Sequence, residues 1–195
     1  MVNGSIEKCA SFADLFAGTG VITNRFIADF DRFIVNDLLF SNWAVYKAFF
    51  EDAPLRQTVL DRYCFEFQQY SGCAVRNNYV SENFGDKFFN LLDARVIGHI
   101  RERIEELKPT LLEKEYYVLL ASLLYSADKA ANTVGHYDAY IRQPYIESRF
   151  HFELIKPLDT SHKKMEIYRE DTNQLARQIQ ADVKGHVVCC QILWA

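Results

Sequence analysis

Residues 11–20 read SFADLFAGTG, and they carry the clearest indication of the fold class. An apolar run that contains one acidic residue, Asp14, leads into a turn with Gly18 and Gly20. Glycine tolerates tight turns and lets the backbone come close to a ligand. Residues 21–30 then follow a helical pattern of apolar positions. The stretch therefore predicts a buried strand, a glycine loop and a helix.

The same order of elements repeats once downstream. Residues 32–37, RFIVND, form a second short apolar run that is closed by an acidic residue, and residues 41–50 are a helix-like stretch rich in aromatic side chains. A strand–helix–strand–helix order is typical of a parallel sheet with helical crossovers. We therefore expect an α/β fold.

The middle of the chain changes character. Residues 53–90 are polar and aromatic without a steady period, whereas residues 90–107 and 113–131 repeat apolar side chains at three- and four-residue spacing. Residues 152–155 and 165–168 have the pattern of strands, and residues 172–180 that of a helix. We expect a cofactor-binding α/β part, a mostly helical target-recognition insertion and a return to the α/β part with an atypical tail from residue 184, over residues 1–52, 53–149 and 150–195.

Composition sets limits on the class of protein. With 195 residues, of which 49% are hydrophobic, the chain can bury a core, and its net charge of −4 gives no global attraction to nucleic acid. No apolar run approaches the roughly 20 residues of a membrane helix, and no secretory pattern precedes residue 11, so we expect a cytoplasmic protein. The five cysteines form no CxxC pair, which predicts reduced thiols and no metal site.

The glycine loop and the second strand together indicate a nucleotide-type site. A loop at the start of a helix lies beside the positive end of the helix dipole. In dinucleotide folds an acidic residue about 20 positions downstream accepts hydrogen bonds from ribose hydroxyls. Asp37 follows Gly20 by 17 residues. The alternatives are that the glycines only form a tight turn and that Asp37 ends a strand or caps a helix.

Two stretches carry a resemblance to a known family. Residues 12–20, FADLFAGTG, resemble the first motif of S-adenosylmethionine-dependent DNA methyltransferases, and residues 34–37, IVND, resemble the second. Dam-type adenine methyltransferases and their relatives in restriction-modification systems are most similar, over residues 11–183. The resemblance implies a partial, Rossmann-like methyltransferase sheet with a largely helical insertion, and S-adenosylmethionine as cofactor. It assigns cofactor binding to Asp14, Phe16, Gly18, Gly20 and Asp37.

Two further segments extend this resemblance. Residues 117–133, followed by Tyr137, are similar to a region of one adenine-methylase subgroup. Residues 167–171, IYRED, resemble the third cofactor motif, which implies that Asp171 contacts the adenine amino group of the cofactor. The alternative is that Asp171 lies at a helix N-terminus, where the dipole favours an acidic side chain without any ligand.

The catalytic motif of this family is missing from the sequence. The family extrudes the target adenine and polarises its amino group with an Asp/Asn-Pro-Pro-Tyr/Phe motif, which occurs nowhere in the 195 residues. Gln143-Pro144-Tyr145 lacks the acid or amide, so no catalytic residue is assigned. We expect a frameshift or stop after Val183, and only Lys8 could stand in for the family's N-terminal lysine. These features predict weak S-adenosylmethionine binding and no methyl transfer.

The insertion is expected to recognise double-stranded DNA. Arginine and asparagine can pair bidentately with base edges, and the alternative is a solvated helix face and loop. A second chain that supplies the catalytic motif is a further expected partner. The candidate DNA-binding residues are Lys129, Asn132, Thr133, His136, Tyr137, Tyr140, Arg142 and Arg149.

Three other interpretations account for some of these features. A cytosine-five methyltransferase shares the opening motif but needs a Pro-Cys nucleophile, and no cysteine here follows a proline. A non-catalytic module that binds DNA or a partner chain remains open, and salt-dependent duplex binding without cofactor dependence would favour it. A decayed gene product that keeps its core also remains open.

Overall fold

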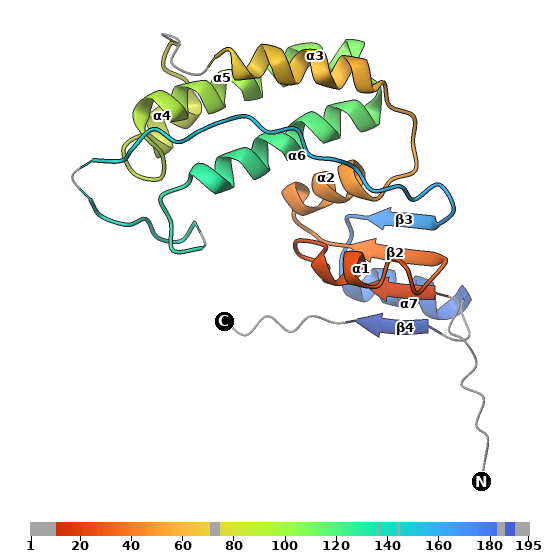
Figure 1. Cartoon of the computed structure of the whole chain (residues 1–195). Helices are drawn as coiled ribbons and strands as arrows, with labels where there is room; N and C mark the ends of the chain where they lie inside the picture. Colours follow the sequence, from red (N-terminus) through yellow and green to blue (C-terminus); the bar gives the residue numbers. More distant parts are fainter. Residues whose placement is uncertain (1–10, 71–74, 136, 144, 183–185, 190–195) are drawn as a thin grey trace. The chain divides into compact units, whose positions relative to one another are not determined.

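The computed structural model describes residues 11–70, 75–135, 137–143, 145–182 and 186–189. The chain divides into two compact units (Figure 1). The sheet unit comprises residues 1–53 and 157–195, and the helical unit comprises residues 54–156.

The sheet unit contains a parallel sheet of four strands among the described residues, in the order β3-β2-β1-β4. Ser11 pairs with Arg32 and with His186, and Arg32 pairs with Lys164. The first residues of the four strands are therefore aligned across the sheet. Its elements are β1 (Ser11–Asp14), α1 (Val21–Arg25), β2 (Arg32–Asn36), α2 (Phe40–Phe49), β3 (Lys164–Tyr168), α7 (Thr172–Asp182) and β4 (His186–Cys189).

Both faces of this sheet are covered by helices, as the burial of β1 and β2 requires. Because side chains alternate along a strand, Phe12 and Phe33 pack on one face against α1 and α2. Ala13 and Ile34 pack on the other face against Leu175 of α7. The apolar runs predicted from the sequence are therefore buried on both sides, and the expected α/β fold is confirmed.

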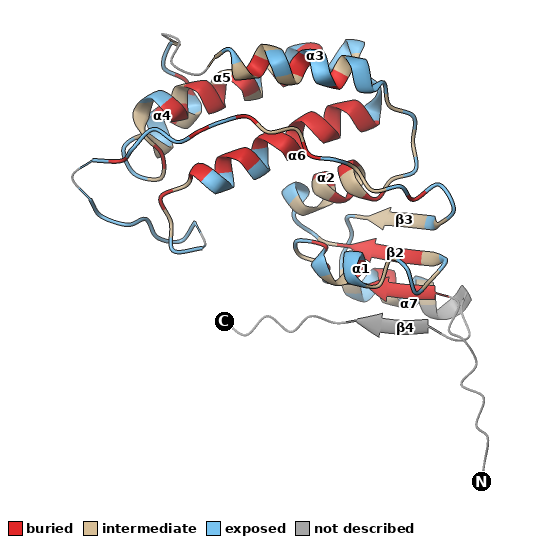
Figure 2. Ribbon diagram, viewed as in Figure 1, coloured by how far each residue is buried: buried red, intermediate tan, exposed pale blue. Residues whose placement is uncertain are grey.

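The helical unit consists of α3 (Gln57–Gln68), α4 (Tyr79–Phe84), α5 (Leu91–Leu107), a short 3-10 turn (Lys108–Thr110) and α6 (Glu113–Ala130). Buried residues extend along almost the whole length of α6 (Figure 2). The helices predicted over residues 90–107 and 113–131 are confirmed.

Three expectations about local structure were wrong. Residues 53–90, where no steady period was recognised in the sequence, contain the helices α3 and α4, and the buried Leu60, Tyr63 and Phe67 of α3 recur on one face. The helix expected over residues 21–30 ends at Arg25.

The third error concerns residues 152–155, which form no strand. The amide of Glu153 donates to Oγ of Ser126, at 2.8 Å, and the amide of Ile155 donates to Oγ of Ser122, at 3.0 Å. Side chains of α6 thus take the place of a strand partner. An apolar run needs burial and satisfied backbone groups, and a neighbouring helix can supply both.

Candidate functional site

The carboxyl ends of β1, β2 and β3 lie at the same edge of the sheet, because the three strands are parallel and in register. Asp14 is the last residue of β1, Asp37 follows β2 directly, and Asp171 comes three residues after β3. Ligands of open α/β sheets bind at this edge. The structure therefore brings the three acidic candidates to the edge where a cofactor is expected.

Asp14 is fully buried, with none of its surface exposed. Its Oδ2 accepts a hydrogen bond of 2.9 Å from the Thr23 hydroxyl, whereas its Oδ1 is buried and has no partner among the described residues. Burial raises the pKa of the Asp14 carboxyl above its ordinary value, and the nearby charge of Asp37 adds to this effect. A buried acceptor without a donor is costly, so this oxygen calls for an explanation, such as an ordered water or a ligand group.

The glycine loop is held from two sides. Gly18 has a φ of 54°, and its amide donates to Oδ2 of Asp37 at 3.0 Å. Its carbonyl accepts from the hydroxyl of Tyr46, which is fully buried in α2. Burial, followed by the charges of Asp37 and Asp14, raises the pKa of Tyr46, so this hydroxyl remains a donor. The Gly18 peptide is thereby fixed before any ligand arrives.

Gly20 is required at its position for two reasons. Its φ of 77° is in the left-handed region, which side chains rarely adopt. A Cβ there would also lie 3.0 Å from the ring of Phe50. Gly20 is the N-cap of α1, and its carbonyl accepts from the amide of Asn24 at 2.9 Å.

Asp37 and Asp171 both accept backbone hydrogen bonds in this structure. Oδ1 of Asp37 accepts from the amide of Leu39 at 2.9 Å, in addition to its bond with Gly18 through Oδ2. Oδ1 of the exposed Asp171 accepts from the amides of Asn173 and Gln174 at 3.0 and 3.1 Å, so it caps α7. Asp37 therefore has the local structural role that was the alternative to ligand binding, and so has Asp171 at the start of α7. Each carboxylate oxygen can still accept a further hydrogen bond.

Asn36 joins the loops that follow the three strands, and sequence reasoning had missed this role. Its side chain is fully buried, and Nδ2 donates to the carbonyls of Leu15 and Glu170, each at 3.1 Å. Its Oδ1 accepts from the amide of Glu170 at 3.0 Å. Thr172 adds a bond of 3.1 Å to the Leu15 carbonyl. The only sequence signal was a polar residue at the end of a buried strand.

Exposed apolar side chains border the same edge. Phe16 follows β1 and is 48% exposed, and Leu38 follows Asp37 and is 69% exposed. Phe40 begins α2, and the guanidinium of Arg169 lies 5.6 Å from its ring centre. Large exposed apolar groups next to buried polar ones are typical of ligand sites.

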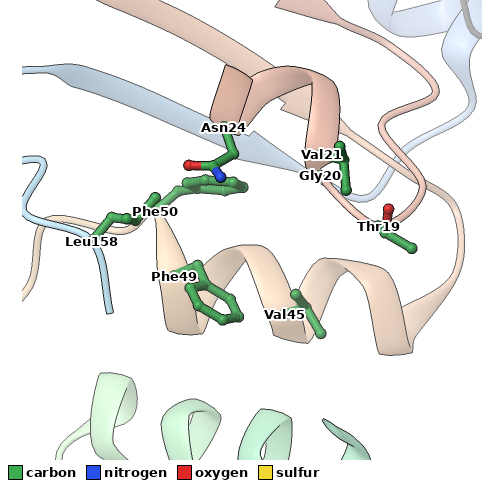
Figure 3. A pocket seen from close by; sticks show the side chains of 8 residues that line it. All are labelled: Thr19, Gly20, Val21, Asn24, Val45, Phe49, Phe50 and Leu158. Atoms are coloured by element: carbon green, nitrogen blue, oxygen red, sulfur yellow. The ribbon is translucent and has the colours of Figure 1, made fainter. Parts of the chain in front are cut away.

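A separate hollow of about 410 Å³ opens between α1 and α2 (Figure 3). None of the acidic candidates lines it, and it has no charged side chain to hold a charged ligand. We therefore place the candidate cofactor site at the strand ends. The hollow is lined by Thr19, Gly20, Val21, Asn24, Val45, Phe49, Phe50 and Leu158.

The candidate DNA-binding residues lie in the last part of α6 and the irregular segment after it. Lys129 is bonded to Glu153 at 2.6 Å, and the Thr133 hydroxyl accepts from the amide of Gly135 at 3.3 Å. Tyr137 and Tyr140 both pack against Phe88. Burial and the neighbouring Asp128 raise the pKa of Tyr137 to about 12. Arg142 is exposed, and His136 lies outside the described residues.

Asn132 differs from the other candidates because it is only 3% exposed. Its Nδ2 donates to the carbonyls of Lys87 and Ile141 at 3.0 and 2.8 Å, and its Oδ1 accepts from Gln143 at 3.0 Å. The Asn132 amide therefore holds the loop together from inside the unit.

The described residues contain neither a cluster of metal ligands nor a membrane-spanning helix. No group of three or more His, Cys, Asp or Glu side chains is placed to hold a metal ion there. In the same part of the chain, no helix is long and apolar enough to span a membrane.

The chain is similar to known DNA methyltransferases. The family model described as D12 class N6 adenine-specific DNA methyltransferase matches residues 3–183. Type II methyltransferase M.NlaIII of Neisseria lactamica is 28% identical over 183 residues, which are 88% of this chain and 53% of the relative. Modification methylase StsI of Streptococcus sanguinis is 30% identical over 186 residues, 88% of this chain and 28% of the relative. No solved structure was found to match.

Modification methylase LlaI of Lactococcus lactis subsp. lactis is 30% identical over 192 residues, which are 89% of this chain and 30% of that protein. The chain thus spans about half or less of the length of these curated relatives.

Proposed function

Because the chain belongs to the D12 class N6 adenine-specific DNA methyltransferases, we propose that its sheet unit binds S-adenosylmethionine and its helical unit recognises the DNA target. The 195 residues contain no Asp-Pro-Pro-Tyr motif, so we assign methyl transfer to residues outside them. The observation that carries the proposal is the buried Oδ1 of Asp14, which has no donor among the described residues.

S-adenosylmethionine fits this edge of the sheet. Its ammonium group would offer Oδ1 of Asp14 the donor that is absent among the described residues, and a charge-assisted hydrogen bond at a buried site is a strong one. The glycine loop brings backbone close to the same place, with the Gly18 peptide fixed by Asp37 and Tyr46. When S-adenosylmethionine is bound, its sulfonium carries the electrophilic methyl group that is transferred.

The other candidates would hold the nucleoside part. Each oxygen of Asp37 already accepts one backbone bond and keeps capacity for a ribose hydroxyl. Phe16 and the exposed Leu38 offer apolar surface to the adenine. Asp171 offers its exposed carboxylate to the adenine amino group while it caps α7.

DNA recognition is proposed for the end of α6 and the following loop. Lys129, Arg142 and Arg149 are exposed cations that suit phosphates or guanine edges, with Thr133, His136 and Tyr137 beside them in sequence. Asn132 contributes by shaping the loop, because its amide is buried and engaged.

The experiment is titration calorimetry of the whole 195-residue chain with S-adenosylmethionine. We expect Asp14→Asn to weaken binding by about 10- to 150-fold, since a hydrogen bond to a charged group contributes roughly 1.5–3 kcal/mol. Asp31→Asn is the matched control, because the Asp31 side chain is 93% exposed on the same unit.

The pH profile of the wild-type chain gives a second measurement that needs no variant. The pKa of Asp14 is raised above the ordinary 3.8, and only the ionised carboxylate attracts an ammonium. Affinity should therefore increase as the pH rises through that raised pKa and then level off. A flat profile together with unchanged binding by Asp14→Asn would refute the proposed site.

Methyl transfer is tested separately with tritiated cofactor and duplex DNA. We expect none from this chain alone, and transfer when a polypeptide with an Asp-Pro-Pro-Tyr segment is added. Methylation by the pure chain would show that the missing motif has been replaced by other residues.

A further inference from the structure

Gln143 and residues 145–149 of the helical unit have neither helix nor strand, yet residues 146–149 are anchored by hydrogen bonds. The carbonyl of the buried Ile146 accepts from Nδ2 of Asn90 at 2.8 Å. The hydroxyl of Ser148 donates to Oδ1 of Asp93 at 2.7 Å, and Oδ2 of Asp93 accepts from the amide of Arg149 at 2.8 Å. Asp93 itself is only 6% exposed. The side chains of Asn90 and Asp93 therefore hold the described backbone of this segment in place.

Four alternate side chains of this segment line one shallow, open hollow. We call this surface the reading face, and it consists of Gln143, Tyr145, Glu147 and Arg149. Tyr145 is 70% exposed, and Glu147 and Arg149 are exposed as well. Within the described residues, no ion pair or hydrogen bond engages the Glu147 carboxylate or the Arg149 guanidinium. Gln143 is steadied by its bond to Asn132.

The chemistry of the reading face differs from that of a surface that only holds phosphates. A carboxylate is repelled by phosphates, so Glu147 would weaken a surface built for the DNA backbone alone. On the edges of bases, both the Glu147 carboxylate and the Arg149 guanidinium have complementary partners. Arginine pairs bidentately with O6 and N7 of guanine, and glutamate accepts from the N4 amino group of cytosine. Glu147 and Arg149 together therefore match the two halves of a G·C pair.

We infer that the reading face recognises a G·C base pair of the DNA target in the major groove. This inference rests on the proposed function. Arg149 donates to guanine, and Glu147 accepts from cytosine. The anchoring by Asp93 and Asn90 makes this recognition specific, because side chains on a fixed backbone discriminate better than those on a loose loop.

The test is selection of randomised duplexes by the whole chain in the presence of S-adenosylmethionine, followed by sequencing. We expect the wild type to enrich a motif with a G·C position. Arg149→Gln should change the preference there from G to A, because glutamine pairs with adenine. Glu147→Gln should reduce discrimination at that position, because it removes the carboxylate that accepts from cytosine, and all other positions should stay unchanged.

The matched controls are Arg76→Gln and Glu102→Gln. They make the same charge changes on an exposed pair of the same unit, 3.8 Å apart, and should leave the motif intact. A uniform loss of affinity with an unchanged motif in the Arg149 and Glu147 variants would overturn the inference and leave only a backbone contact. Wild-type chain that binds no duplex would instead overturn the proposed DNA recognition itself.

Discussion

At the scale of single residues, Tyr46 decides how rigid the glycine loop is. Its hydroxyl reaches the Gly18 carbonyl from α2, while Asp37 holds the amide of the same residue. Neither contact is local in sequence, since the Tyr46 hydroxyl spans 28 positions and the Asp37 bond spans 19. The glycine motif alone therefore explains why the chain turns here. It does not explain how the Gly18 peptide is held in place, which depends on Tyr46 and Asp37.

Tyr46→Phe removes this hydroxyl and keeps the ring. We expect S-adenosylmethionine to bind roughly 2- to 12-fold more weakly, because a neutral hydrogen bond contributes about 0.5–1.5 kcal/mol. Adenosine, which lacks the methionine part near the loop, should lose much less affinity. Calorimetry with both ligands measures this difference.

Tyr63→Phe is the control for Tyr46→Phe, because Tyr63 is a buried tyrosine of the helical unit. Equal losses for S-adenosylmethionine and adenosine in Tyr46→Phe would argue against a role in positioning the loop and for a general structural effect.

At the scale of elements, α3 and α6 are joined by a buried carboxylate. Glu115 is fully buried and accepts from the amide and Nε of Arg56, at 2.7 and 2.8 Å, and from the amide of Leu112, at 2.8 Å. The Arg56 guanidinium holds the pKa of Glu115 below its ordinary value. This carboxylate therefore fixes the start of both helices.

Glu115→Gln should lower the free energy of unfolding at pH 7 by about 1–3 kcal/mol, because backbone and guanidinium donors lose acceptors. A carboxyl whose pKa is lowered in the folded state stabilises the fold at any pH above its ordinary pKa of 4.5. This stabilisation is lost as the pH falls through the lowered pKa. The difference between wild type and variant should therefore shrink in acid. Urea denaturation followed by far-ultraviolet circular dichroism measures it.

Glu106→Gln serves as the control for Glu115→Gln, since the Glu106 side chain is 66% exposed. If both variants unfolded at the same urea concentration, the buried carboxylate would have no special part in the stability of the helical unit.

At the scale of the whole molecule, the net charge of −4 limits how the chain can bind DNA. Affinity for a duplex falls with salt in proportion to the phosphates that cations neutralise, with a slope of about 0.9 for each contact. Only a few cations, among them Lys129 and Arg142, are proposed to face phosphates, whereas Arg149 is proposed to contact a base. On this proposal, base contacts contribute a larger share of the affinity than they do in a basic protein.

We therefore expect a slope of about 2–3 in a plot of log affinity against log salt, reduced by about 0.9 in Arg142→Gln. Fluorescence anisotropy of a labelled duplex between roughly 50 and 200 mM salt measures it. Arg95→Gln, which changes an arginine bonded to Asn77, should leave the slope unchanged. A slope near 10 would reveal an extensive basic surface that the proposal does not contain.

The sequence by itself determined the strand, glycine loop and helix order, because glycine conformation and the spacing of apolar residues act over a few positions. It also determined α5 and α6, which are long and periodic. It did not determine α3 or the path of residues 152–155, where the backbone amides are satisfied by Ser122 and Ser126 of a distant helix.

The tertiary structure alone decided how the candidate site is arranged. Asn36 and Thr172 join the three loops through hydrogen bonds between segments up to 157 positions apart. Packing of the same segments leaves one buried oxygen of Asp14 without a donor among the described residues. The physical reason is that a sequence pattern reports which side chains avoid water, whereas the partner of a buried polar atom is set by the packing of elements far apart in the chain.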